Sequence, residues 1–165
     1  MKVSDNYDIR EFVSPHTWNE WGTSCIWFVD PKLINGFELL KAVAEIKYGE
    51  CSVVVNGWLY DMGYTGSGYR NPDQYNTGQF RNNPNSDSLH RQGKAGDAKI
   101  KIKSTGKWLS SDEMFALVQN HEAAFLEVGI TCVENPEKTK GRTRDWLHID
   151  CRNTNGAKDI LIVNP

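Results

Sequence analysis

Strict alternation between apolar and polar residues predicts two half-buried strands, over residues 95–102 and 146–152. The apolar face of the first strand consists of Gly96, Ala98, Ile100 and Ile102. The apolar face of the second consists of Leu147, Ile149 and Cys151. Because successive side chains of a strand point to opposite faces, Asp97 and His148 are both expected on the side away from the core.

Capping signals predict two helices. Asp30 followed by Pro31 is a helix start, and apolar residues on one face continue to about Lys47, with Gly49 ending the helix. Ser110 and Glu113 form a capping box that starts the second helix. The apolar face of this second helix consists of Met114, Leu117, Val118, Ala124 and Phe125, and His121 falls in its middle.

Shorter apolar runs predict further strands at residues 51–56, 128–133 and 159–163, the last at a sheet edge. The aromatic-rich residues 1–29 are expected to be irregular structure packed over the core. Residues 57–89 are rich in glycine and asparagine, which predicts a long loop that frames a cleft. The expected fold is α+β, a small antiparallel sheet flanked by helices in one domain over residues 1–165.

Charge and composition narrow the classes of function. The net charge of −2 gives no electrostatic reason to expect nucleic-acid binding. No run approaches the ~20 apolar residues that span a bilayer. The first residues lack the apolar run of a signal peptide, which predicts synthesis in the cytoplasm. The four scattered cysteines predict buried free thiols in a reducing compartment, and a structural disulfide is the alternative.

Two segments carry candidate chemistry. His90 and Asp97 lie seven positions apart, and Asp145 precedes His148 by three. Two imidazoles, one carboxylate ligand and one spare carboxylate are the components of a hydrolytic zinc site with an open position for water. Gly93 and Gly96 argue against a helix here, so we expect a tight loop leading into the strand.

Three sequence blocks resemble the M15 peptidases, the zinc D-Ala-D-Ala carboxypeptidases and L-alanyl-D-glutamate endopeptidases. Every fixed position of the family pattern Ser-x-His-x-x-Gly-x-Ala-x-Asp, followed by an acidic residue three before a histidine, is filled: Ser88, His90, Gly93, Ala95, Asp97, Asp145 and His148. The block at residues 67–70 resembles the family's Ser-Gly-Tyr-Arg segment, although a long insert separates it from Asn56. Residues 11–13 and 53–58 also resemble phage-encoded and small bacterial members.

The resemblance implies a fold shared with the hedgehog signalling domain, Zn²⁺ as the cofactor and a peptidoglycan stem peptide as the substrate. It implies His90, Asp97 and His148 as metal ligands and Asp145 as the catalytic base. Arg70 would bind substrate or the developing oxyanion, and Ser88 would bind substrate or shape the loop. The phage members imply a wall hydrolase that is virion-associated or released to the cell wall.

Several alternatives stay open at this point. The chain could instead be a non-catalytic virion-structural or wall-binding module that keeps the fold and the metal. Asp150 could orient an imidazole or pair with Arg152. His121 is either a packed histidine with a satisfied hydrogen bond or a contact to substrate. The basic residues at 138–144 are either a solvated loop or a rim that attracts carboxylates.

Overall fold

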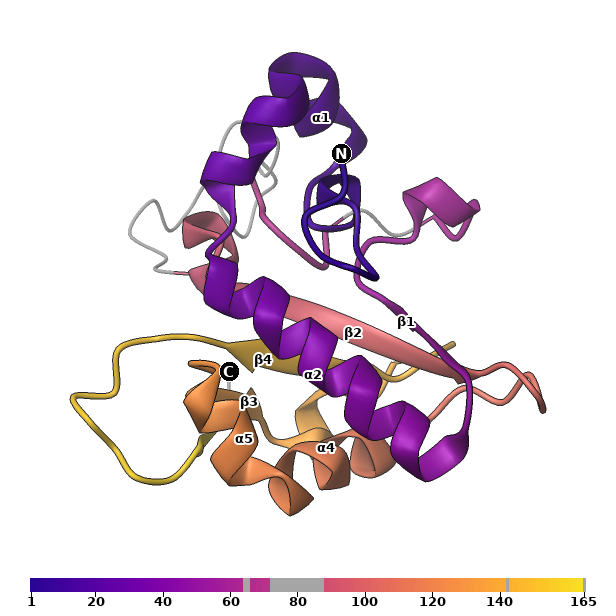
Figure 1. Cartoon of the computed structure of the whole chain (residues 1–165), viewed down its shortest axis with the longest axis vertical. Coiled ribbons are helices and arrows are strands. Elements are labelled where there is room, and N and C mark those ends of the chain that lie inside the picture. Colours follow the sequence, from indigo (N-terminus) through magenta and orange to yellow (C-terminus); the bar gives the residue numbers. More distant parts are fainter. Residues whose placement is uncertain (64–65, 72–87, 142, 165) are drawn as a thin grey trace.

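The computed structural model describes residues 1–63, 66–71, 88–141 and 143–164. It is an α+β structure (Figure 1). The α-helices of the described chain are α1 (Pro15–Trp21), α2 (Pro31–Tyr48), α4 (Ser111–Asn120) and α5 (Glu122–Glu127). The strands are β1 (Cys51–Val54), β2 (Ala95–Ile102), β3 (Cys132–Glu134), β4 (Leu147–Asp150) and β5 (Leu161–Val163). Short 3₁₀ helices are η1 (Ile9–Glu11), η2 (Gly22–Phe28), η3 (Trp58–Tyr60), η4 (Leu89–Gln92) and η5 (Pro136–Lys138).

The strands form one five-stranded sheet in the order β1-β2-β4-β3-β5. Neighbouring strands are antiparallel except for β3 and β5, which run parallel. The expectation of an antiparallel sheet is therefore wrong at this edge. Strand β5 follows β4 in the sequence but pairs with β3, on the edge of β3 that β4 does not occupy. Strand β3 is antiparallel to β4, whereas β5 runs in the same direction as β3.

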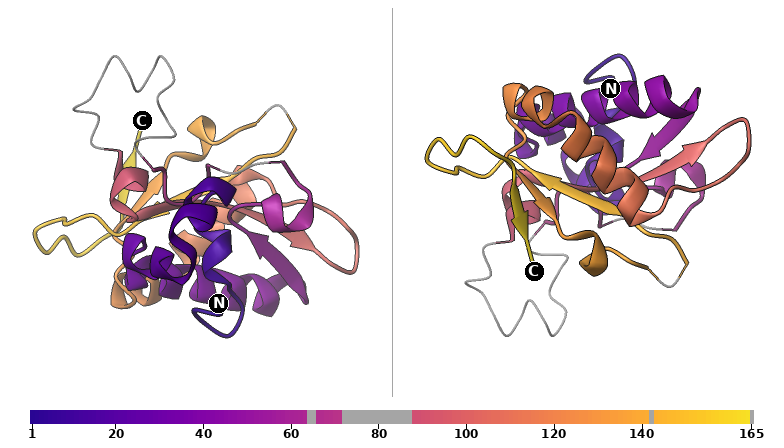
Figure 2. Two further views of the ribbon diagram at one scale, coloured as in Figure 1. Left: turned by 90° about the horizontal axis from the view of Figure 1, so that it is seen from above. Right: turned by 90° about the horizontal axis from the view of Figure 1, so that it is seen from below.

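Helix α2 confirms the predicted capping signals. The Asp30 side chain accepts a hydrogen bond from the backbone N–H of Lys32, Pro31 occupies the first turn, and Gly49 ends the helix at φ 78°. Figure 2 shows α2, α4 and α5 gathered on the same side of the sheet.

Two expectations about helices are wrong. The second predicted helix is two helices, because His121 leaves helical geometry at φ −127° and ends α4 before α5 begins. Residues 1–29 are not irregular throughout, since they contain η1, α1 and η2. Helix α1 starts with Ser14 as N-cap and Pro15 behind it, the same signal that starts α2.

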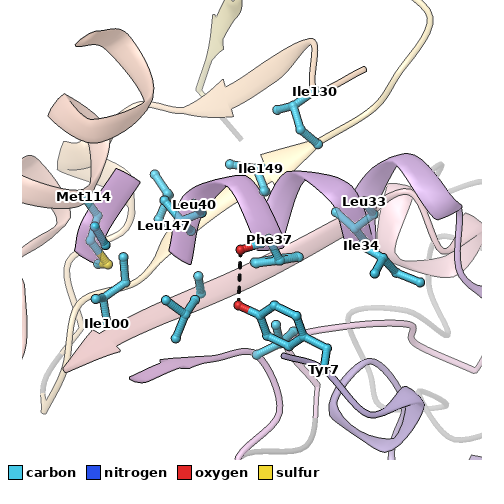
Figure 3. Packing of buried hydrophobic residues seen from close by; sticks show 14 of the residues in the cluster. Tyr7, Leu33, Ile34, Phe37, Leu40, Ile100, Met114, Ile130, Leu147 and Ile149 are labelled. Atoms are coloured by element: carbon cyan, nitrogen blue, oxygen red, sulfur yellow. Dashed lines mark hydrogen bonds between the residues drawn. The ribbon is translucent and has the colours of Figure 1, made fainter. Parts of the chain in front are cut away.

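The core lies between α2 and the sheet (Figure 3). Its largest fully buried side chains include Phe37 and Leu40 of α2 together with Ile100 and Leu147 of the sheet. At Gly96 an added Cβ would lie 2.8 Å from the Phe37 ring, so this face of β2 is pressed against α2. Asp97, the next residue along β2, consequently points to the opposite face.

The described chain has no helix of the length and apolar character that a membrane span requires. All four cysteines, Cys25, Cys51, Cys132 and Cys151, are buried and free, which confirms the predicted free thiols and makes the disulfide alternative wrong.

Candidate metal centre

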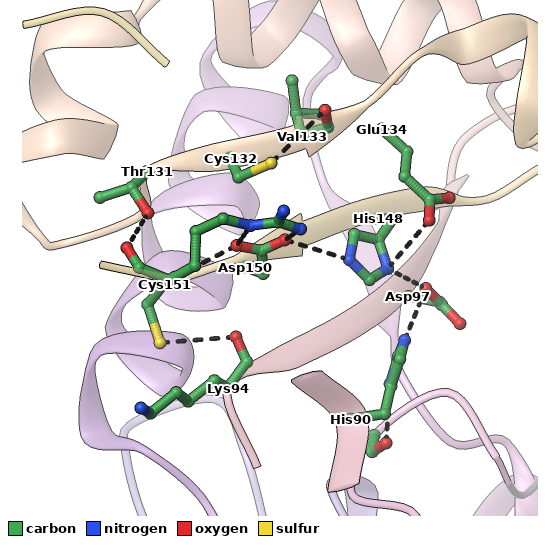
Figure 4. Close-up of polar contacts among 12 residues, drawn as sticks. His90, Lys94, Asp97, Thr131, Cys132, Val133, Glu134, His148, Asp150 and Cys151 are labelled. Carbon is green, nitrogen blue, oxygen red and sulfur yellow. Dashed lines mark hydrogen bonds and ion pairs between the residues drawn. The ribbon is translucent and has the colours of Figure 1, made fainter. Parts of the chain in front are cut away.

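His90, Asp97 and His148 come together on the sheet face away from α2 (Figure 4). One ligand atom from each residue lies within 4.8 Å of the other two. Asp97 Oδ1 is 2.9 Å from His148 Nδ1 and 3.5 Å from His90 Nε2. The two imidazole rings have centroids 5.1 Å apart. The predicted ligands thus form one cluster.

Strand register brings two of these residues together. In the antiparallel pair of β2 and β4, Asp97 is the direct cross-strand partner of His148. Directly opposite residues hold their Cβ atoms about 4.5–5.5 Å apart on one face of the sheet. The alternation that buries Ala98 and Leu147 on the core side therefore places Asp97 and His148 side by side.

The 3₁₀ helix η4 supplies the third residue, His90, and a glycine fixes its end. Gly93 has φ +66°, and an added Cβ there would lie 1.7 Å from the carbonyl oxygen of Phe28. No other residue fits this position without moving the backbone. The Gly93 carbonyl in turn accepts a hydrogen bond from the N–H of Asp30 at 2.9 Å, which ties η4 to the start of α2.

Hydrogen bonds determine which ring nitrogen of each histidine faces the cluster. His90 Nδ1 lies 2.9 Å from the Gly68 carbonyl oxygen, which leaves Nε2 toward Asp97. His148 Nε2 lies 3.4 Å from Asp150 Oδ2, which leaves Nδ1 toward Asp97. Such outer partners set the tautomer and the orientation of metal-binding imidazoles.

Asp150 is fully buried, and it both contacts the His148 imidazole and pairs with Arg152, the two roles considered for it from the sequence. Arg152 donates from Nε to Oδ1 at 2.9 Å and from its terminal nitrogen to Oδ2 at 2.6 Å. Burial raises the pKa of Asp150, but the bonds to Arg152 and His148 outweigh it and hold that pKa well below its usual range.

The opposite charges of Asp97 and His148 stabilise each other. Burial opposes the charge of His148, yet the hydrogen bonds to Asp150 and Asp97 raise its pKa to about 10. Burial also opposes the charge of Asp97, but the positive field of His90 and the hydrogen bonds to both histidines hold its pKa well below the usual range. The anionic Asp97 is therefore ready to act as a ligand, whereas His148 must release its proton first.

The structure places Arg70 at the cluster despite the insert before it. A terminal nitrogen of its guanidinium lies 3.5 Å from Asp97 Oδ2, and Nε donates to the Gly66 carbonyl at 2.7 Å. Ser88 is the N-cap of η4 but its side chain makes no capping bond. Its carbonyl accepts from the N–H of Arg91 at 2.8 Å, which fits a loop-shaping role.

Asp145 lies in a different environment from the one that the family pattern implies. Its Oδ2 accepts from the N–H of Ser111 at 3.0 Å, at the start of α4, and its Oδ1 accepts from the N–H of Gly141 at 3.1 Å. Within the described chain, no hydrogen bond or ion pair joins Asp145 to the three clustered residues. The carboxylate holds α4 to the segment before β4.

Glu134, at the end of β3, is a carboxylate that the sequence interpretation did not assign. Its Oε1 lies 3.9 Å from His148 Nδ1, on the side of the ring that faces Asp97 (Figure 4). Burial raises its pKa above the usual range. Glu134 directly follows the strand predicted at residues 128–133, and this position in the sequence does not indicate which strand lies next to it.

The donor set could hold a metal ion. Two imidazole nitrogens with fixed orientations and one carboxylate are ligand types that occur in metal sites, and three protein ligands would leave a further position for water or substrate. The histidines are buried and their outward nitrogens are already held by Gly68 and Asp150.

Other candidates from the sequence lie elsewhere. His121 Nδ1 lies 2.9 Å from the Leu117 carbonyl oxygen, which is the packed and satisfied arrangement. Lys140 pairs with Glu137 at 2.6 Å on the surface, as in a solvated loop. Arg142 and residues 72–87 of the predicted cleft loop lie outside the described residues.

Comparisons of the chain with protein-family models, with curated proteins and with solved structures find no match.

Proposed function

We propose that the protein is a zinc-dependent peptidase that hydrolyses peptidoglycan stem-peptide bonds, of the D-Ala-D-Ala carboxypeptidase or L-Ala-D-Glu endopeptidase type. The observation that carries the proposal is the convergence of His90, Asp97 and His148 from η4, β2 and β4. The order and spacing of these residues resemble those of the M15 peptidases.

A zinc ion bound there would polarise a scissile carbonyl and lower the pKa of a water molecule toward about 7. Asp97 and the two histidines would hold it, and Asp150 would keep His148 in the required orientation. Arg70 would bind a substrate carboxylate or the developing oxyanion. The resemblance assigns the uptake of the water's proton to Asp145.

Cationic side chains near the cluster support a substrate that carries carboxylates. Besides Arg70, Lys99 follows Asp97 by two on the same face of β2, and its Nζ donates to Ser67 Oγ at 3.4 Å. Lys99 interacts electrostatically with both Asp97 and Arg144, and burial lowers its pKa. Stem peptides carry several free carboxylates, so such a surface would orient them. The phage resemblance extends the proposal to a host-lysis or tail-associated wall hydrolase.

One observation favours a second candidate, a non-catalytic metal-binding module of a virion or a wall-binding protein. A binding module needs no catalytic base, so the presence of Asp145 would favour an enzyme if its carboxylate were free to accept a proton. Here both oxygens accept backbone hydrogen bonds, so the residue has a structural reason to be present.

Incubation of the zinc-loaded protein with purified muropeptides and mass analysis of the products separates the two candidates. The peptidase predicts a mass change that corresponds to release of D-Ala or to cleavage after L-Ala. The matched controls are the chelated protein and His148→Ala, which should both be inactive. Zinc binding without any cleavage would support the module, and cleavage at an equal rate by the chelated protein would overturn the zinc mechanism.

A further inference from the structure

We propose that Glu134, rather than Asp145, is the carboxylate that takes the proton of the attacking water. The inference rests on the proposed hydrolytic function and assigns one catalytic residue within it. The observations that support it are the strand register, the distances at His148 and the different partners of the two carboxylates.

The sheet places Glu134 next to the cluster. Strands β3 and β4 are antiparallel and pair Cys132 with Asp150 and Val133 with Ile149. One further step in the same register puts Glu134 opposite His148, as Asp97 is opposite His148 on the other side. His148 therefore lies on the central strand of three, with a carboxylate beside it from each neighbour.

Both carboxylates approach the same ring atom. His148 Nδ1 is 2.9 Å from Asp97 Oδ1 and 3.9 Å from Glu134 Oε1 (Figure 4). Nδ1 is the ring nitrogen that faces Asp97, so the Glu134 carboxylate lies on the same side of the ring as the clustered ligand atoms. Its side chain is 15% exposed, which leaves a path for water while most of the carboxylate is shielded.

Glu134 and Asp145 differ in what their oxygens already bind. Both Asp145 oxygens accept backbone N–H groups. Within the described residues no donor makes a hydrogen bond to the Glu134 carboxylate, and its ion-pair partner is His148. A carboxylate with free lone pairs beside the ligand cluster can accept a proton without breaking a structural bond.

The step balances without a further reactant. The water oxygen forms a C–O bond to the scissile carbonyl carbon, and one water proton moves to Glu134. The C–N bond then breaks, and the proton passes from Glu134 to the leaving nitrogen, which restores the carboxylate.

The test uses Glu134→Gln in the full chain and two readouts that need no peptide substrate. The first is zinc affinity by competition with a chromogenic chelator. The second is the binding of acetohydroxamic acid to the zinc-loaded protein, because a hydroxamate bound to a metal ion shares its acidic proton with a neighbouring carboxylate. The matched control is Glu137→Gln, an exposed glutamate three residues further on that pairs with Lys140.

We expect Glu134→Gln to keep zinc affinity within about threefold and to weaken acetohydroxamate binding by at least about tenfold, the loss of one charge-assisted hydrogen bond. Stem-peptide hydrolysis should fall by about a hundredfold or more. Glu137→Gln should change none of these. Glu134→Ala serves as a second variant and should behave in the same way, and thermal unfolding checks that both variants fold.

Two results would overturn the assignment. A loss of zinc affinity of more than about tenfold in Glu134→Gln would make Glu134 a fourth ligand. Unchanged acetohydroxamate binding in both variants would show that Glu134 does not contact a ligand bound at the cluster. If the wild-type protein cleaves no stem peptide, the proposed function fails, yet the zinc and hydroxamate measurements still decide the position of Glu134.

Discussion

Asp97 and His148 are direct cross-strand partners, and the bond of 2.9 Å between Oδ1 and Nδ1 joins residues 51 positions apart in the sequence. Without a metal ion this contact is an ion pair between a carboxylate and an imidazolium. A metal ion bound there would take the same two atoms as ligands. Its binding would therefore change both the charge and the stability of the centre of the sheet.

Zinc should stabilise the folded chain. A ligand that binds only the folded state adds about 2.7 kcal/mol when its concentration is a hundred times the dissociation constant. The unfolding midpoint should therefore rise with zinc and return after chelation. Asp97→Asn should abolish the zinc-dependent rise, and an equal rise in that variant would contradict the ligand set.

The chelated protein should lose stability in alkali through His148. Its pKa is raised to about 10 in the folded chain, against about 6.5 in an unfolded one. The stabilising contribution is therefore complete below about pH 6.5 and is lost as the pH rises through about 10. Urea unfolding at pH 6, 8 and 10 should show this decline in the wild type and a weaker one in His148→Gln. Parallel pH profiles would argue against the protonated pair.

Asp145 should matter for stability. Asp145→Ala leaves the N–H groups of Ser111 and Gly141 without their acceptor, which should lower the free energy of unfolding by about 1–3 kcal/mol. The control is Asp112→Asn, at an exposed position in the first turn of α4, next to Ser111. Its free energy of unfolding should stay within about 0.5 kcal/mol of the wild type. A variant at position 145 that loses hydrolysis at full stability would instead support the catalytic role that the family resemblance implies.

Arg152 should stabilise the folded chain, because it compensates the buried charge of Asp150. Arg152→Leu removes two hydrogen bonds from a carboxylate with no solvent exposure, and the expected cost is about 2–4 kcal/mol of unfolding free energy. Adding Asp150→Asn should recover part of that loss, because the buried group is then uncharged. Strictly additive effects in this double-variant cycle would show that the two side chains do not interact.

The cysteines should be unreactive until the chain unfolds. All four are buried, and burial raises the pKa of Cys132 and of Cys151 to about 12, so almost no thiolate is present at neutral pH. A dithiobis-nitrobenzoate assay should therefore detect less than about one thiol in the native protein and all four in denaturant. Rapid reaction of the native protein would contradict this packing.

Local signals in the sequence predicted the elements that carry two of the clustered residues. The alternation of apolar and polar residues predicted β2 and β4, and it predicted that Asp97 and His148 point away from the core. This was possible because the period of two is a property of each strand alone. The caps at Asp30 and Ser110 gave the starts of α2 and α4 for the same reason. Ser14 and Pro15 carry the same start signal for α1, within a segment whose many aromatic residues indicate irregular packing instead.

Features that depend on pairing between distant strands could not be predicted. The position of β3 between β4 and β5 results from contacts across the sheet, and no local pattern encodes it. Glu134 therefore had no visible connection to His148. Asp145 shows the converse, since its spacing from His148 matched a motif while its partners in the fold are backbone groups of α4 and the preceding segment.

Gly93 lies close against the backbone of Phe28, so the residues before Asp30 support the 3₁₀ helix that carries His90. Phe12 supports the neighbouring segment in a similar way, because its carbonyl accepts the N–H of Tyr69 at 2.7 Å, next to the Gly68 carbonyl that holds His90. Deleting the residues that precede Asp30 would remove no ligand, yet it would release the loop that carries one. A metal ion at this cluster would thus depend on the residues before Asp30 as well as on the sheet.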